Sequence, residues 1–394
     1  MHTICECFSE KEYEKLEPWI QWVSAVTGLD ANSHKVFRLG DVIDANIEQI
    51  YERLEKKGYK IGAISPMNVN NKLKEPAFFL PDPWTNTSSD KSFWNENLYK
   101  ALKQAVNDNA DNKIEFKSLI IILLTFLKFY KFKNLKLYLK LFFRSFKRPW
   151  CRSLILDLLL HDIHLSLLKQ NVDFSSIFFN AGAHIQHHYF YNMVENKKKN
   201  PQWYVKDNIN PAFDLFEVYD TIIGDYLKLY KNNIIVATGL SQELSEHPFY
   251  YYRLKDHESF FRKMNIKFTN IFPRMSRDFL IEFENEADSK QAEHKISNIT
   301  DNNGLKLFSE VDNRGKSIFV SLTYSDEIKK NTIAIFENKN LNLYDEVSFV
   351  ALKNGIHSTT GYLFASENIQ KMKSNSFHVK NIFNIIDNYF IKKN

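Results

Sequence analysis

The chain contains 394 residues, which is enough for one large domain or two, and its 44% hydrophobic and 25% charged residues are typical of a globular protein. The net charge of +5 is too small to indicate nucleic-acid binding, so we expect no nucleic-acid partner. Cys5, Cys7 and Cys151 show neither a disulfide framework nor zinc-ligand spacing, which favours a reducing, cytoplasmic location. The first residues lack a signal-peptide pattern, and no apolar run of about 18 residues predicts a membrane span.

The amino-terminal part predicts a helix and then a strand of an α/β sheet. Residues 10–27 indicate a helix that begins near Pro18, because proline suits a first helical turn, and ends before Gly28. Glu17 lies at the positive end of this helix, where it is either an acid–base group or metal ligand, or a carboxylate that only stabilises the helix dipole. Residues 1–10 show no apolar run, so we expect no buried strand there. A helix over 46–57 and a strand over 60–65 follow.

Residues 113–152 form a basic segment. Nine lysines and arginines follow Leu127, apolar residues lie between them, and Glu115 is the only acid. This composition fits an anionic membrane surface, which would place the protein at the inner face of a membrane, or a helical cap with a solvated basic face.

The middle of the chain contains most of its histidines. An amphipathic helix over 153–169 has His161 and His164, which we interpret as core or surface histidines because no third ligand is near in sequence. The apolar run 177–179 predicts a buried strand. The loop predicted after this strand contains His184, His187 and His188, and imidazole suits zinc and related divalent ions. The three histidines are therefore either part of a functional site or a surface cluster.

Two further elements complete a predicted strand–loop–helix–strand unit. Residues 216–227 have helical spacing, and residues 233–242 predict a second buried strand with a polar tip. Open α/β sheets bind their ligands at the carboxyl ends of the strands. Asn180 after the first strand, and Ser241 and Gln242 at the tip of the second, are therefore candidate site residues.

The carboxyl-terminal part predicts a small subdomain and a last core segment. Residues 266–345 indicate a βαββ arrangement with strands at 279–283, 305–311 and 317–323 and a helix at 288–299. Arg274 and Arg277 either bind an anionic group, because a guanidinium fits phosphate or sulfate oxygens, or form ordinary surface pairs. In the last segment, Gly355 precedes His357 by two residues.

Several of these elements resemble the alkaline phosphatase superfamily, in particular its phosphodiesterase, nucleotide pyrophosphatase and sulfatase branches. In that family a strand ends in Asp-x-x-x-His, a helix with Asp and Gly follows, and the next strand ends in Asp-His-Gly. Here Asn180 replaces the Asp and His184 is kept; residues 219–224 match the helix, and residues 238–241 lack the Asp-His pair. The Gly355-x-His357 sequence resembles the late Gly-x-His loop of the family. Pro18 stands where the family has its nucleophile, and the family's first strand is not found.

The resemblance implies an α/β fold with a mostly parallel central sheet and helices on both faces. The expected parts are a core over 1–112, 153–265 and 346–394, a basic helical insert at 113–152, and the subdomain at 266–345. It also implies a divalent metal, zinc or manganese, bound by His184 and His357. Catalytic candidates are Glu17, Ser241 and Gln242, and the remaining polar residues are candidates for substrate binding: Asn180, His187, His188, Arg274 and Arg277.

The expected function is hydrolysis of phosphate or sulfate esters on a small molecule or glycan, within surface-polysaccharide metabolism. Two alternatives remain open at this point. One is a catalytically degenerate binding protein, and the other is a transferase that modifies a glycan or lipid.

Overall fold

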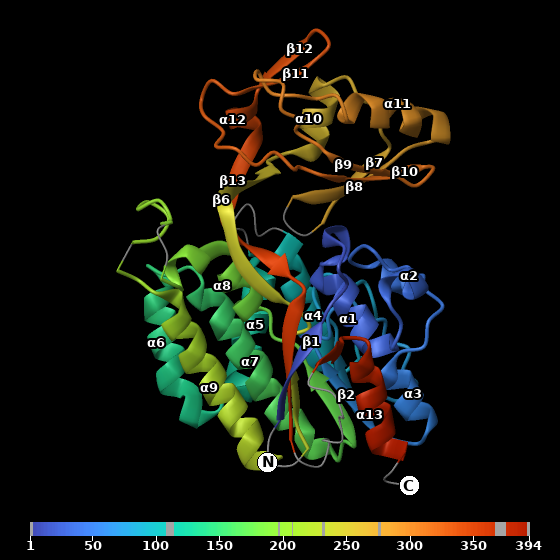
Figure 1. Cartoon of the computed structure of the whole chain (residues 1–394), viewed down its shortest axis with the longest axis vertical. Coiled ribbons are helices and arrows are strands. Elements are labelled where there is room, and N and C mark those ends of the chain that lie inside the picture. The colour runs from blue at the N-terminus through green and yellow to red at the C-terminus, as the bar shows by residue number, and fades with distance from the viewer. Residues whose placement is uncertain are drawn as a thin grey trace. The chain divides into compact units, whose positions relative to one another are not determined.

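The structure is a computed structural model that describes residues 3–107, 114–195, 198–206, 208–230, 233–274, 277–366 and 376–391. The chain divides into two compact units (Figure 1). Unit 1 comprises Met1–Ala101, Ile120–Ser245 and Gly355–Asn394, and unit 2 comprises Leu102–Leu119 and Glu246–Asn354. The boundary expected at 112/113 lies outside the described residues.

Unit 1 contains two small sheets. One is parallel, with the order β3-β2-β4, and consists of β2 (Ile61–Ile64), β3 (Phe78–Leu80) and β4 (Phe174–Ile177). The other has the order β15-β1-β14-β5 and consists of β1 (Thr3–Phe8), β5 (Ile235–Ala237), β14 (Thr360–Ala365) and β15 (Ser376–His378). In this second sheet β14 is antiparallel to both β1 and β5, and β1 is parallel to β15.

The expectation of one mostly parallel central sheet is therefore wrong. The two strands that flank the predicted strand–loop–helix–strand unit belong to different sheets, because β4 pairs with β2 and β5 pairs with β14. The strand expected at 177–179 overlaps β4 only at Ile177, whereas β5 lies within the second expected strand, and the residues of both strands are half-buried and not buried as expected. Their apolar runs identify them as strands but contain no information about partner or direction, which long-range contacts decide.

The expectation that residues 1–10 contain no buried strand is also wrong. Residues Thr3–Phe8 form β1, which pairs with a strand on each side. Cys5 and Cys7 are buried, whereas Ile4, which precedes Cys5, is 72% exposed, and Glu6, which lies between the two cysteines, is exposed as well. The strand thus alternates between a covered and an open face, and the two covered residues are cysteines, so no apolar run marks it.

The helices of unit 1 cover these sheets and form a helical layer of their own (Figure 1). Those that fall wholly or partly in unit 1 are α1 (Pro18–Thr27), α2 (Ala31–His34), α3 (Ile50–Lys56), α4 (Phe93–Asn107), α5 (Phe116–Phe129), α6 (Leu135–Ser145), α7 (Cys151–Leu167), α8 (Ala181–Tyr189), α9 (Pro211–Leu229) and α13 (Asn381–Ile391). Helices α6 to α9 pack around one core that includes Trp150, Leu158 and Val218. Because this core fixes α8, it also positions the histidines on that helix.

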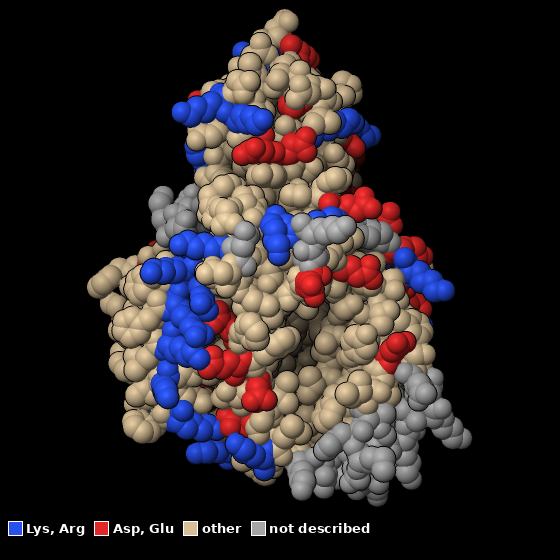
Figure 2. Space-filling view, turned by 60° about the vertical axis from the view of Figure 1, so that its left-hand side comes forward, with Lys and Arg blue, Asp and Glu red and all other residues tan. Residues whose placement is uncertain are grey.

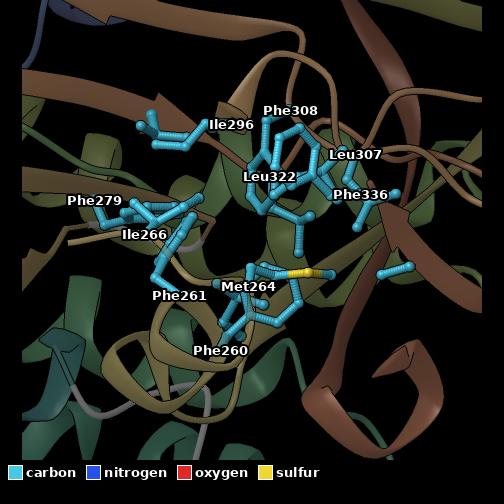
Figure 3. Packing of buried hydrophobic residues seen from close by; sticks show 14 of the residues in the cluster. Phe260, Phe261, Met264, Ile266, Phe279, Ile296, Leu307, Phe308, Leu322 and Phe336 are labelled. Atoms are coloured by element: carbon cyan, nitrogen blue, oxygen red, sulfur yellow. The ribbon is translucent and has the colours of Figure 1, made fainter. Parts of the chain in front are cut away.

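Unit 2 has an antiparallel sheet and its own core. The sheet has the order β7-β8-β10-β9, and its strands are β7 (Asn270–Pro273), β8 (Asp278–Glu282), β9 (Glu310–Asn313) and β10 (Ser317–Ser321). The remaining elements are the hairpin β11 (Ile333–Phe336) and β12 (Lys339–Asn342), and the helices α10 (His257–Lys263), α11 (Glu286–Ile296) and α12 (Leu343–Glu346). Phenylalanine rings dominate the core, with Phe260, Phe261, Phe279 and Phe308 in mutual contact (Figure 3). Of the predicted elements, 279–283, 288–299 and 317–323 are confirmed, and 305–311 is a strand only from Glu310 on.

The chain passes from unit 1 to unit 2 within α4 and returns within α5. It passes a second time within β6 (Ser241–Leu254) and returns within β13 (Val347–Ser358), and these two strands pair with each other. Among the helices of the described ranges, none combines the length and the apolar character that crossing a membrane requires.

Candidate functional site

The histidines at 184, 187 and 188 lie on helix α8 and not in a loop, so the predicted loop is wrong. Ala181, Ile185 and Tyr189 repeat every four residues and are buried against α7 and α9. This spacing fixes a helix with one apolar side. His184, His187 and His188 therefore lie on its other sides, where each is partly exposed.

A buried carboxylate holds the amino end of α8. Asp157 of α7 accepts hydrogen bonds from the backbone N–H groups of Asn180 (3.3 Å) and Ala181 (3.0 Å) and from the hydroxyl of Tyr219 (2.9 Å). Burial raises the pKa of Asp157 to about 7, against the lowering effect of these donors. Asn180, a predicted substrate-binding residue, thus begins the helix. Sequence reasoning missed Asp157, although a carboxylate within an apolar helical run is a signal that could have found it, as it could have found Asp162 in the same helix.

The central contact of the site joins α8 to the end of β13. The Nε2 atom of His187 lies 3.0 Å from the Nε2 atom of His357, and the ring centroids are 4.7 Å apart. His357 was expected in a Gly-x-His loop, but it lies inside strand β13 and is buried. All atoms of this contact belong to unit 1.

The outer nitrogen of each ring faces an acceptor. The Nδ1 atom of His187 lies 3.2 Å from the carbonyl oxygen of Gly355, which can only accept, so Nδ1 carries the hydrogen. The Nδ1 atom of His357 lies 3.6 Å from the carboxylate Oε2 of Glu17, an ion-pair distance. In a neutral ring with its hydrogen on Nδ1, Nε2 has a lone pair. His357 therefore either donates Nε2–H to Nε2 of His187 at 3.0 Å or, with its hydrogen on Nδ1, turns a second lone pair toward that of His187, an arrangement that a proton or a cation bound by both nitrogens stabilises.

Glycine is required at 355 because α8 and β13 approach closely there. A Cβ atom on Gly355 would lie 2.4 Å from the carbonyl oxygen of Gln186 and 2.6 Å from Oε1 of Gln242. Gln242 is buried, and its amide nitrogen donates to the carbonyl oxygen of Ala183 at 3.2 Å. The predicted residue Gln242 is thus brought to the site, where it ties β6 to α8.

The other two histidines of α8 form a second ring pair. The centroids of His184 and His188 are 4.8 Å apart, and those of His187 and His188 are 6.1 Å apart. Burial lowers the pKa of His184 to about 4, so its ring is neutral at physiological pH, as a metal-binding imidazole must be. The structure therefore pairs His357 with His187, and the predicted ligand His184 contacts His188.

The remaining predicted residues have different surroundings. Ser241 is the first residue of β6, after a turn at Gly239, and not the end of β5. Arg274 and Arg277 belong to unit 2, where the guanidinium of Arg277 lies 4.5 Å from the centre of the Tyr251 ring. His161 and His164 are buried in α7 and bonded to Asp225 and to Tyr226 and Ser175, as core histidines are.

The described ranges contain no group of three or more His, Cys, Asp or Glu side chains arranged to hold a metal ion. A cation at the His187–His357 contact would therefore have two imidazole ligands, with other positions left for a substrate or for Glu17. No family model matches the chain, and no curated protein does.

Proposed function

We propose that the chain is a metal-dependent hydrolase of phosphate or sulfate esters, with a zinc or manganese ion held between Nε2 of His187 and Nε2 of His357. One observation carries this proposal: two imidazoles face each other at 3.0 Å while their Nδ1 atoms face a carbonyl and a carboxylate. Metal-binding histidines have this arrangement, because the partner at the outer nitrogen fixes the tautomer and the ring orientation.

The substrate class rests on the resemblance of residues 180–188, 219–224 and 355–361 to the alkaline phosphatase superfamily, which we retain as a hypothesis about chemistry and not about the sheet. A divalent ion acts as a Lewis acid on an ester oxygen. Phosphate or sulfate on a small molecule or glycan is the proposed substrate. The three cysteines are free and buried, which supports a reducing, cytoplasmic setting.

The side chains around the two rings have distinct roles in this proposal. Glu17, at the start of α1, orients His357 and is the proposed base. His188 and His184 extend the imidazole surface along α8, where a partly exposed ring is able to contact an anionic substrate. Gln242 and Gly355 hold the two elements at the distance that brings the rings together.

Metal content of the purified protein, measured by mass spectrometry, tests the proposal. We expect about one zinc or manganese per chain, lost in His187→Ala and in His357→Ala and kept in His294→Ala, an exposed histidine of unit 2. Assays on an aryl phosphate, a phosphodiester and an aryl sulfate then identify the ester. A wild-type protein that neither contains nor binds these ions contradicts the metal site.

A second candidate function is a binding protein that holds the same class of anion without cleaving it. It is supported by Pro18, which occupies the position where the resembled family has a nucleophile, and by the two-histidine limit on a metal site within the described residues. In this case the protein binds phosphate or sulfate esters in calorimetry but releases no product in the three assays. The third expectation, a transferase, has no observation that favours it.

A further inference from the structure

Helix α6 exposes apolar side chains on the side that faces away from its core. Tyr138, Leu141 and Ser145 are buried, as expected for the inner side of a surface helix. The outer side has Leu139, Phe142, Phe143 and Phe146, which are 50%, 52%, 68% and 70% exposed. A surface helix normally has charged or polar residues there. The ring of Phe142 contacts the rings of Phe143 and Phe146, with centroids 5.7 and 5.3 Å apart.

The neighbouring helix α5 also exposes apolar side chains and buries a polar one between residues 120 and 129. Leu123 and Leu127 are 54% and 57% exposed, whereas Thr125 is fully buried. The two helices are in contact through Phe126 and Tyr138, whose ring centroids are 4.9 Å apart. We call the six exposed residues Leu123, Leu127, Leu139, Phe142, Phe143 and Phe146 the apolar face.

Cations accompany the apolar face, and acids do not. Residues 120–152 contain nine lysines and arginines and no aspartate or glutamate. Four of the nine form ion pairs with α9: Lys133 with Asp225, Lys140 with Glu217, and both Arg144 and Arg148 with Asp214. Two of these cations, Lys140 and Arg144, belong to α6 and join it to α9.

Four exposed cations remain without a carboxylate partner among the described residues, namely Lys128, Lys136, Lys147 and Arg152. Lys136 precedes Leu139 by about one helical turn, and Lys147 follows the last residue of α6, Ser145, by two positions, so the two lysines flank the apolar stripe of α6 in the sequence. Figure 2, which brings the α6 and α9 side of Figure 1 forward, shows lysines and arginines in a long band, with uncharged surface on its left and acidic side chains on its right.

We propose that the apolar face docks onto an anionic lipid bilayer, with the phenyl rings at the acyl boundary and the four free cations at the headgroups. The charge complementarity selects this occupant, because an apolar stripe flanked by lysines and without acids matches acyl chains beside anionic phosphates. A second copy of this chain would bring like charges together. The proposal is independent of the histidine site and adds a membrane-surface location to any activity there.

Co-sedimentation of the full chain with vesicles tests the proposal. We expect the wild type to sediment with vesicles of phosphatidylcholine mixed with phosphatidylglycerol, and not with phosphatidylcholine alone, and to be released by high salt. Lys136→Gln/Lys147→Gln is expected to lower the partition coefficient about 25-fold, since each lysine near an anionic surface contributes about fivefold. Phe142→Ser/Phe143→Ser is expected to abolish binding without lowering the melting temperature, because both rings are exposed.

Matched substitutions away from the apolar face serve as controls. Lys60→Gln/Lys74→Gln makes the same charge change at exposed positions of unit 1, and Phe37→Ser/Phe93→Ser removes two other exposed rings. Both are expected to bind like the wild type. Equal losses in the controls, or no binding of the wild type to anionic vesicles, overturn the proposal. It is also overturned if sedimentation velocity shows a dimer that Phe142→Ser/Phe143→Ser dissociates while vesicle binding is absent.

Discussion

His187 and His357 are 170 residues apart in the sequence, and their Nε2 atoms are 3.0 Å apart in the structure. Each ring is held from its outer nitrogen, His187 by the carbonyl oxygen of Gly355 and His357 by the carboxylate of Glu17. The contact therefore depends on three elements, α1, α8 and β13, which fix it from different directions. This dependence makes the site sensitive to changes outside the two imidazoles.

Glu17→Gln tests the carboxylate beside His357. The substitution keeps the shape of the side chain but removes its charge, so His357 loses the partner that favours a hydrogen on Nδ1. Second-shell partners of metal-binding histidines typically contribute about 10- to 100-fold to metal affinity. We therefore expect zinc affinity, measured by competition with a chromogenic chelator, to fall by at least about tenfold.

The control for this change is Glu12→Gln, which removes an exposed carboxylate that pairs with Lys15 near the same helix. It is expected to leave zinc affinity unchanged. If both variants bind zinc like the wild type, Glu17 is only a first-turn carboxylate, which was the other interpretation of its position.

Gly355→Ala tests the close approach of β13 to α8. The new Cβ atom would meet the carbonyl oxygen of Gln186 at 2.4 Å, so strand and helix must move apart. We expect a loss of about 1–3 kcal/mol in the free energy of unfolding, as for other overpacked sites, together with weaker zinc binding. Gly224→Ala is the matched control, because its Cβ atom meets nothing within 4 Å on helix α9. It is expected to stabilise the protein by about 0.5–1 kcal/mol in urea denaturation.

The sequence allowed some of this site to be predicted, because residue type and local spacing are visible in it. His187 was a candidate on the chemistry of imidazole and His357 on the resemblance of its Gly-x-His sequence to a family motif, and most helices and strands follow from periodicity. The α8 helix was taken for a loop because three histidines and a glycine obscure the four-residue repeat of Ala181, Ile185 and Tyr189. The same information does not specify which histidine meets His357, since this depends on the rotation of α8 about its axis.

The sheet arrangement could not be predicted for a related reason. A strand such as β5 is only three residues long, and its antiparallel partner β14 lies more than a hundred residues further along the chain. The energy that selects such a partner is distributed over contacts with α1 and α13, of which Trp22 and Ile385 are part. The local sequence pattern contains no information about these contacts. The expected sheet was therefore the one that the family resemblance implies, and it is wrong for this chain.

Thr125→Val tests the inverted polarity of α5. The hydroxyl of Thr125 is buried, and no hydrogen-bond partner for it is found among the described residues. Replacing the hydroxyl with a methyl group removes the desolvation cost at nearly constant shape, so we expect the protein to gain about 1 kcal/mol in the free energy of unfolding. Thr27→Val is the control, because the buried hydroxyl of Thr27 donates to Val23 at 2.7 Å and accepts from Leu29 at 3.3 Å. This control is expected to lose about as much as Thr125→Val gains.

Asp157→Asn tests the buried carboxylate that holds the amino end of α8. Burial raises the pKa of Asp157 from 3.8 to about 7, so the folded protein binds a proton that the unfolded chain releases between these pH values. Stability therefore falls as the pH rises from about 4 to about 7, by roughly 4 kcal/mol for this group. Asp157→Asn cannot titrate, so the stability of the wild type relative to this variant should fall by this amount over that range, as measured by urea denaturation.

Asp30→Asn is the control of opposite sign, because hydrogen bonds from Ser33 and Lys380 lower the pKa of Asp30. The wild type should exceed that variant at neutral pH and lose the advantage as the pH falls below about 4. A difference between the wild type and Asp157→Asn that stays constant from pH 4 to pH 7 contradicts the role of Asp157 as a buried, protonated cap.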